Sequence, residues 1–311
     1  MSSLNNSKVL VPLAFFAVYV VWGSTYLFVA YAVEEIPPFL LSGIRYIAAA
    51  GILLGIVAVF KQFKGITSTQ VKNSLFAGIM LLGIGSGGVA WSLQRLDSGF
   101  TALLIATQPL VTLLMMWAFN KEKPENASFF GVFLGLIGAY LLLSQDTILA
   151  TTDQWMAVLV IFVCLFVWAY ATIFINKGDM PKAFMANTGI QLISGGLFAF
   201  VFSYVVLQEE TVIWSEVSQF GWVSLLILIV LGGAVVFVAF NYLLKQTSPE
   251  KVATTTYVNP IIALALGWWF RDELVTTQSV VAATVMLTGV IFINFEWERI
   301  KGFFKKSLKE G

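Results

Sequence analysis

The chain has 311 residues, of which 59% are hydrophobic and only 11% are charged, and its net charge is +1. So much apolar side chain predicts a protein whose solvent is mostly lipid, and the near-neutral charge gives no support to a nucleic-acid partner. Histidine is absent and Cys164 is the single cysteine. These two facts exclude Ser-His-Asp and Cys-His catalysis, an intramolecular disulfide and the common zinc sites, and neither a metal nor a cofactor is expected.

Apolar runs follow one another along the chain. Each has roughly the 17–25 residues that an α-helix needs to cross a bilayer, and the first is too long for the apolar region of a signal peptide. Backbone in lipid must satisfy its own hydrogen bonds, and no barrel-like alternation is present, so helices are expected. The chain is therefore predicted to be an all-α membrane protein with ten transmembrane helices, near 10–32, 39–60, 74–94, 98–119, 128–144, 155–175, 184–207, 220–244, 252–270 and 277–295.

The charged residues between these runs predict the orientation of the protein. If the N-terminus is cytoplasmic, all but three of the 18 basic residues fall on the cytoplasmic side. The exceptions are Arg95 and Arg271 in outer loops and Arg45 inside the second run, while the outer loops are acidic, as at Glu34 and Glu35. This distribution follows the positive-inside rule and predicts that both termini are cytoplasmic.

The two halves of the chain resemble each other. Five spans per half is an odd number, so the second half must enter the membrane from the opposite side. We therefore predict two inverted five-helix repeats, at 1–146 and 147–296, followed by a basic cytoplasmic tail at 297–311. The matching positions are Trp22 with Trp168 and Arg45 with Gln191 in one register, and Gln108-Pro109 with Asn259-Pro260, Glu122 with Glu273 and Gly138 with Gly289 in a second register.

Several motifs stand in the order of a known family. WGSTY at 22–26, PPF at 37–39 and SGIRY at 42–46 resemble the start of the EamA-type proteins of the drug/metabolite transporter superfamily, including the YedA-like bacterial exporters. The stretches 97–143 and 248–294 resemble the endings of two EamA units. The resemblance implies a ten-helix fold in the bacterial cytoplasmic (inner) membrane, a central cavity shared by both halves, and export of amino acids or other small metabolites.

Arg45 is the most informative single residue, because a charge at the centre of a span costs about 2.5–3.5 kcal/mol on insertion scales. It lies seven residues after Pro38, or about 10 Å deep at 1.5 Å per residue. In one interpretation its long side chain reaches the outer interface or pairs with Glu34 or Glu35. In the other, the guanidinium faces the cavity and meets a carboxylate of the solute.

The amide–proline pairs are candidate elements of the pathway. A proline removes a backbone N–H and bends a helix, so Pro109 and Pro260 are predicted hinges, with Gln108 and Asn259 facing the solute. The alternative is a packing kink with a structural amide. The other candidates are polar or aromatic residues within spans, for which the alternative is helix–helix packing: Trp22, Thr25, Tyr26, Trp168, Gln191, Asn241 and Tyr257. The glycine pairs Gly51/Gly55, Gly83/Gly87 and Gly131/Gly135 predict close packing of helices.

The expected function is that of a secondary transporter that exports small metabolites by alternating access. No Walker motif is present, so ATP is not the direct driver, and no paired carboxylates or metal set suggest an intramembrane enzyme. A small-molecule solute and the lipid bilayer are the expected partners, with a homodimer left open. The alternative function is a non-transporting membrane sensor or scaffold.

Overall fold

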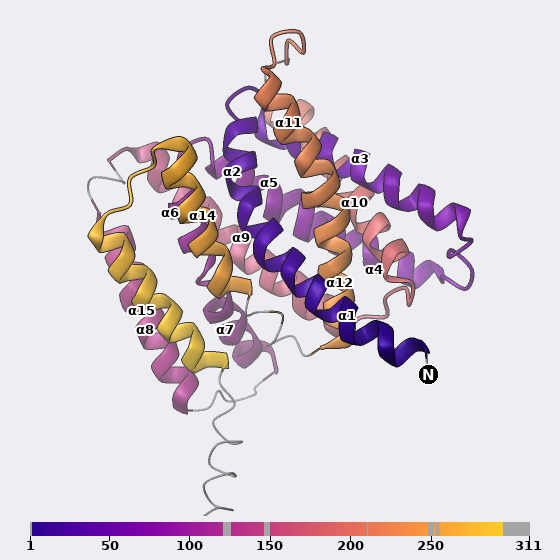
Figure 1. The fold of residues 1–311 in the computed structure, drawn as a ribbon, viewed down its shortest axis with the longest axis horizontal. Helices are drawn as coiled ribbons and strands as arrows, with labels where there is room; N and C mark the ends of the chain where they lie inside the picture. Colours follow the sequence, from indigo (N-terminus) through magenta and orange to yellow (C-terminus); the bar gives the residue numbers. More distant parts are fainter. Residues whose placement is uncertain are drawn as a thin grey trace, which may run out of the picture.

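The chain folds into a bundle of helices (Figure 1). This computed structural model describes residues 2–120, 126–145, 150–209, 211–247, 252 and 255–294, and within those ranges it contains helices and no strand. Side chains at 2–8, 119–120, 126–127, 256–257, 290 and 293–294 are outside the description. The prediction of an all-α protein is therefore confirmed.

Several of the helices join end to end into longer rods, because a π-helical segment (η) continues an α-helix without a break. The first half of the chain forms α1 (Ser2–Phe16), η1 (Ala17–Val21), α2 (Trp22–Ala32), α3 (Pro38–Val59), α4 (Ser68–Gly78), η2 (Ile79–Ser86), α5 (Gly87–Ser92), α6 (Ser98–Ile105), α7 (Gln108–Asn120) and α8 (Asn126–Leu143). The second half forms α9 (Thr152–Lys177), α10 (Phe184–Val201), η3 (Phe202–Leu207), α11 (Gln219–Ile227), η4 (Leu228–Val235), α12 (Val236–Gln246), α14 (Thr255–Arg271) and α15 (Thr277–Asn294).

Local sequence signals explain where several helices begin. Helix α3 starts with Pro38, whose fixed φ suits the first helical position and whose missing N–H would have no partner there. Helices α4 and α9 each start with a capping box, formed by Thr67 with Gln70 and by Thr151 with Gln154. In each box the two side chains satisfy backbone N–H groups that the first turn leaves unpaired.

The helices also support the predicted membrane class. Helices α8, α14 and α15 occupy most of the remaining apolar runs at 128–144, 252–270 and 277–295. The membrane class is confirmed, and the number of ten spans stays a prediction. Seven helical stretches within the described residues are long and apolar enough to cross a membrane: Val9–Ala32, Pro38–Val59, Ser68–Ser92, Ser98–Ala118, Thr152–Lys177, Phe184–Leu207 and Gln219–Gln246.

Helices α8 and α15 pack side by side along their lengths (Figure 1). Two glycines allow this close contact. A Cβ added at Gly138 would lie 2.9 Å from the backbone nitrogen of Met286, and one added at Gly289 would lie 2.8 Å from the backbone nitrogen of Gly135. Residues 135 and 138 correspond to 286 and 289 at a constant offset, so the contact is reciprocal and the helices are antiparallel.

Helices α3 and α10 show the same reciprocity. A Cβ at Gly43 would lie 2.9 Å from the backbone nitrogen of Phe200, and one at Gly189 would lie 3.7 Å from the backbone nitrogen of Leu54. Residues 43 and 54 correspond to 189 and 200 at a constant offset. Two separate helix pairs therefore pack through matching positions of the two halves.

The glycine pairs behave differently from one another. Gly83 and Gly87 lie against aromatic rings, because added Cβ atoms would come within 2.6 Å of Phe198 and Phe39 respectively. The prediction of close packing is wrong for Gly51 and Gly55, where an added Cβ meets nothing within 4 Å. These two glycines lie on the outward face of α3, among exposed hydrophobic side chains.

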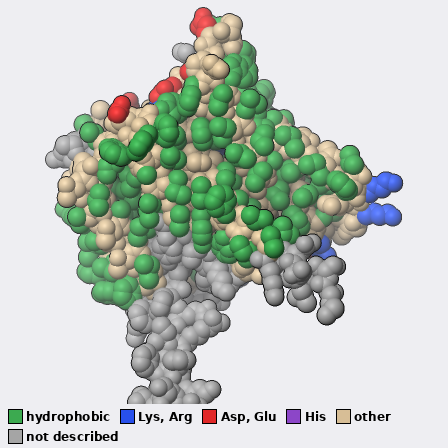
Figure 2. Space-filling view, viewed as in Figure 1, with side chains coloured by type: hydrophobic (Ala, Val, Ile, Leu, Met, Phe, Trp, Pro, Cys, Tyr) green, Lys and Arg blue, Asp and Glu red, His purple; other side chains and the backbone are tan. Residues whose placement is uncertain are grey.

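Side chains are sorted by type over the surface. Figure 2 shows a broad hydrophobic surface with acidic side chains at the top of the bundle and Lys and Arg side chains at its right-hand side. Beneath the acidic end lies a buried apolar cluster that joins α2, α3 and α5 to α11 and η4. Its members include Val29, Ile36, Leu41, Leu93 and Leu225.

Candidate functional site

A cavity of about 320 Å³ lies between the two halves of the chain. Its walls come from α2, α3, η2, α5, α6 and α7 of the first half and from α9, η4, α12 and α14 of the second half. The lining begins at Leu93, a member of the apolar cluster near the acidic end. It reaches Leu244, next to Lys245 in the last turn of α12. A concave, mostly apolar space with a few polar groups is typical of a small-molecule site.

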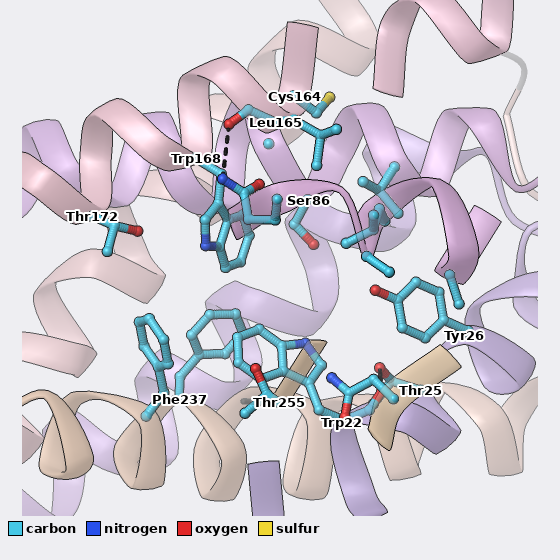
Figure 3. Close-up of a pocket in the computed structure, with 18 of the residues that line it drawn as sticks. Trp22, Thr25, Tyr26, Ser86, Cys164, Leu165, Trp168, Thr172, Phe237 and Thr255 are labelled. Atoms are coloured by element: carbon cyan, nitrogen blue, oxygen red, sulfur yellow. Dashed lines mark hydrogen bonds between the residues drawn. The ribbon is translucent and has the colours of Figure 1, made fainter. Parts of the chain in front are cut away.

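Most of the predicted site residues line this cavity. In Figure 3, Trp168 and Thr172 on α9 face Trp22, Thr25 and Tyr26 on α2 across a common space. Gln191 and Asn241 are not among the lining residues, and the side chain of Tyr257 lies outside the described residues. The predicted residues that line the cavity are Trp22, Thr25, Tyr26, Arg45, Gln108, Pro109, Trp168, Asn259 and Pro260.

Arg45 is buried in the wall of the cavity with only 5% of its surface exposed. Its Nη2 donates to the Tyr46 hydroxyl at 2.6 Å and to Ser86 Oγ at 2.8 Å, and the two hydroxyls bond to each other. The Nε of the same guanidinium has no hydrogen-bond partner within the described chain. Arg45 is thus held in place by neutral hydroxyl groups, and its Nε is buried without a partner among the described residues.

The acidic residues that were alternative partners for Arg45 are engaged elsewhere. Glu34 pairs with Arg271 at 2.8 Å. Glu35 accepts two hydrogen bonds from Ser218, one from the backbone N–H and one from the hydroxyl, both at 2.6 Å. In this structure Arg45 therefore pairs with neither residue and is buried in the cavity wall. That its guanidinium meets a carboxylate of the solute stays a prediction.

Aromatic rings form much of the remaining wall. The ring centroids of Trp22 and Trp168, which align in the first predicted register, lie 5.8 Å apart. Trp22 also contacts Phe237 at 5.5 Å and Phe240 at 5.4 Å in edge-on arrangements. Such tilted contacts suit the ring quadrupoles and hold the indoles in fixed positions. The result is an aromatic surface in the wall of the same cavity that Arg45 lines.

The two predicted amides make matching contacts across the halves. Gln108 Nε2 donates to the backbone oxygen of Leu165 in α9 at 3.2 Å, the bond drawn in Figure 3. When the amide nitrogen of Asn259 faces η1, it donates to the backbone oxygens of Val18 at 3.0 Å and of Tyr19 at 2.8 Å. Leu165 and Tyr19 are equivalent positions in the register that pairs Trp22 with Trp168.

The two prolines differ in their effect on the helix. Before Pro109 the helix is interrupted at Ala106 and Thr107, between α6 and α7. Pro260 instead lies inside the continuous helix α14. An interruption of the helix therefore accompanies Pro109 in the first half. At Pro260 the helix is unbroken within the described residues.

Gln191 and Asn241 belong to a separate buried polar cluster. Asn241 Nδ2 donates to Gln191 Oε1 at 3.2 Å and to Thr188 Oγ1 at 3.0 Å. Asn187 donates to Asn241 Oδ1 at 3.2 Å and accepts from Ser74 Oγ at 2.7 Å. The cluster joins α10 and α12 to α4 by hydrogen bonds. Its geometry agrees with the structural alternative of a helix–helix hydrogen bond.

The cavity also contains residues that the sequence patterns did not single out. Tyr46 and Ser86 hold Arg45, and Thr172 Oγ1 is buried without a hydrogen-bond partner in the described chain. Ser86 lies in a glycine-rich stretch, GIGSGG at 83–88, which was the one available signal for close approach of another helix. Phe237 and Thr172 sit in ordinary apolar runs and give no comparable signal.

Comparisons with known proteins decide the family. The sequence profile of the EamA-like transporter family matches residues 10–144 and again residues 155–295. The chain belongs to the EamA-like transporter family. The inner membrane transporter YedA of Escherichia coli K12 is 29% identical over 92% of this chain and 91% of its own length. The transporter YoaV of Bacillus subtilis 168 is 25% identical over 94% of this chain and 99% of its own length.

A solved crystal structure shares the fold, with a TM-score of 0.67 at 15% identity over 93% of this chain and 98% of that chain. As an EamA-like protein the chain is a membrane transporter rather than an enzyme, and its partners are a small-molecule solute and the lipid bilayer. The cavity between the halves is the natural place to look for the solute.

Proposed function

We propose that this EamA-like protein is a secondary transporter that exports small metabolites carrying a carboxylate, by alternating access through the cavity between its halves. The observation that carries the proposal is Arg45. It is a buried cation in the cavity wall that has no carboxylate partner among the described residues. An unpaired charge within a membrane protein is costly and marks a solute or ion pathway.

The chemistry of the site favours an anionic or zwitterionic solute. A guanidinium is permanently charged and binds a carboxylate through paired N–H donors. Tyr46 and Ser86 orient Arg45 without neutralising it. The indoles of Trp22 and Trp168 supply an apolar surface for the rest of the solute. Amino acids and related small acids combine these two features.

Alternating access rests on the relation between the halves. The α8–α15 and α3–α10 contacts are reciprocal and antiparallel, and the amides of Gln108 and Asn259 reach equivalent carbonyls in opposite halves. These features support two inverted five-helix repeats, at 1–146 and 147–296, and ten spans in total. Inverted repeats that exchange conformations open a central site to one side and then to the other.

The direction of the cavity follows from charge. Its lining runs from the apolar cluster under the acidic end toward Lys245. The positive-inside rule places the acidic end outside the cell, so we assign the structure to an inward-facing state of a protein in the bacterial inner membrane with both termini cytoplasmic. The start of α1 and the end of α15 lie in the lower part of Figure 1, away from the acidic end, which supports that assignment.

A metabolite screen tests the proposal. Cells that overproduce the protein should release specific carboxylate-containing metabolites, and Arg45→Gln should lower that release by about tenfold or more while the protein is still inserted in the membrane. Arg95→Gln is the matched control, because Arg95 stacks on Trp91 at 3.7 Å and does not line the cavity. Release that is equal in Arg45→Gln and wild type would refute the role of Arg45. No change in any metabolite would favour the alternative of a sensor or scaffold.

A further inference from the structure

Three carboxylates near the acidic end each bind the first turn of a helix in the opposite half. Glu35 of the first half accepts from Ser218 at the start of α11. Glu209 of the second half accepts from the backbone N–H groups of Phe39 at 3.3 Å and Leu40 at 3.1 Å, at the start of α3. We refer to Glu35, Glu209 and Glu273 together as the outer latch.

Glu273 makes the most buried of these contacts, with 9% of its surface exposed. It accepts from the backbone N–H groups of Ser98 at 2.9 Å and Gly99 at 3.0 Å, and from Ser98 Oγ at 2.9 Å, at the start of α6. Arg271 lies 3.4 Å from Glu273 and 2.8 Å from Glu34, and so ties α14 to the end of α2 as well.

For α3 and α6 these bonds replace caps that the helices lack, whereas α11 has a cap of its own, because Ser218 Oγ accepts from the Gly221 N–H. Neither α3 nor α6 has a side-chain cap from its own N-cap residue, Pro37 and Asp97 respectively. The first turn of a helix leaves N–H groups unpaired and carries a partial positive charge, so an anion there is stabilising. The caps of α3 and α6 therefore exist only while the two halves stay together at this end.

The opposite end of the bundle is held differently in the described part of the chain. There Asp179 accepts from the side chain of Gln70, at 2.8 Å from its Nε2, in the first turn of α4. Glu122, the sequence counterpart of Glu273, lies outside the described residues. Among described residues, the carboxylate contacts between the halves are thus concentrated at the acidic end.

We propose that the outer latch is the gate that keeps the outer mouth closed in this inward-facing state, and that its bonds to the starts of α3, α6 and α11 break each time the cavity opens outward. The apolar cluster directly beneath it forms the seal, and the latch holds the helices that carry this seal. The inference rests on the inward-facing cavity of the proposed function. The three latch residues would then set the equilibrium between the inward-facing and outward-facing states.

Side-specific labelling tests the latch. Val89 lines the cavity on α5, so Val89→Cys in a Cys164→Ala background provides a single reporter thiol. A membrane-impermeant maleimide is applied to right-side-out vesicles and, separately, to inside-out vesicles. The reporter should react from the inside and be protected from the outside.

The rate at which the reporter is labelled from the outside should rise when the latch is weakened. The latch variants are Glu35→Gln, Glu209→Gln and Glu273→Gln, made singly and together. Loss of the charge-assisted hydrogen bonds of one carboxylate should shift the equilibrium between the inward-facing and outward-facing states by about tenfold toward the outward-facing state. Glu216→Gln is the matched control, because Glu216 is exposed at the same end and its side chain makes no hydrogen bond or ion pair with the first half among the described residues.

The outcomes separate the two claims. In one outcome the reporter reacts from the inside, but in every latch variant its rate of labelling from the outside stays equal to that of Glu216→Gln. This outcome would overturn the latch and leave the proposed function intact. In the other outcome the reporter does not react from the inside when Glu35, Glu209 and Glu273 are all present. This outcome would contradict the inward-facing cavity, and the latch with it. The single variants decide the matter if the triple variant fails to reach the membrane, because each keeps the size of the side chain.

Discussion

Gly138→Ala should destabilise the protein, whereas Gly51→Ala should not, although both add the same methyl group to a helix. At Gly138 the new Cβ would lie 2.3 Å from Met286 Cγ and 2.9 Å from the backbone of α15, and at Gly51 it meets nothing within 4 Å. The side chain of Met286 can move, but the backbone of α15 cannot move without separating the helices. Overpacking of this kind costs about 1–3 kcal/mol.

The comparison is informative because the gain in helix propensity from glycine to alanine, about 1 kcal/mol, is common to both variants and cancels. The difference in free energy of unfolding between Gly51→Ala and Gly138→Ala should therefore be about 1–3 kcal/mol. It can be measured by SDS titration in mixed micelles. Gly289→Ala should match Gly138→Ala, because its Cβ would lie 2.6 Å from the backbone of α8. Equal stability of Gly51→Ala and Gly138→Ala would refute the reciprocal packing of α8 and α15.

Burial raises the pKa of Asp97, the nearby Glu273 raises it further and Arg271 opposes both. A raised folded-state pKa means that the stability contributed by this group is present at acid pH and is lost as the pH rises above about 4. Asp97→Asn should therefore be more stable than wild type at pH 7 and the same at pH 3, which thermal midpoints in detergent across that range would check. Gln108→Leu and Asn259→Leu should each lower the free energy of unfolding by about 1 kcal/mol or more, because each removes the hydrogen bonding of one amide to backbone oxygens of the opposite half. An unequal loss in SDS titration, with one variant unaffected, would contradict the equivalence of the two amides.

The sequence predicted the architecture better than the individual side-chain contacts. Apolar runs set the helices because lipid leaves the backbone no alternative, so the all-α class could be read directly. The aligned amides Gln108 and Asn259 were found because polar residues are few in such runs. Their partners, backbone carbonyls of the opposite half, could not be found, because carbonyls carry no sequence signal.

Equivalent positions also diverged in ways that only packing reveals. Arg45 and Gln191 align, yet one lines the cavity and the other lies in a buried amide cluster. The depth of Arg45 left two interpretations open, and the sequence could not show that Glu34 and Glu35 bind Arg271 and Ser218, far along the chain, rather than Arg45. Likewise the spacing of Gly51 and Gly55 predicted a contact that the tertiary arrangement does not make.

The most direct test of the account is flux in proteoliposomes that contain the purified protein. The solute is a carboxylate-containing metabolite from the screen, and its methyl ester is the matched neutral control. Wild type should show saturable flux of the acid. Arg45→Gln should lower kcat/KM for the acid by about tenfold or more, as expected for loss of a hydrogen bond to a charged group, and should leave the ester unaffected. Equal flux of the acid through wild type and Arg45→Gln would contradict the claim that the solute passes through this cavity and binds Arg45.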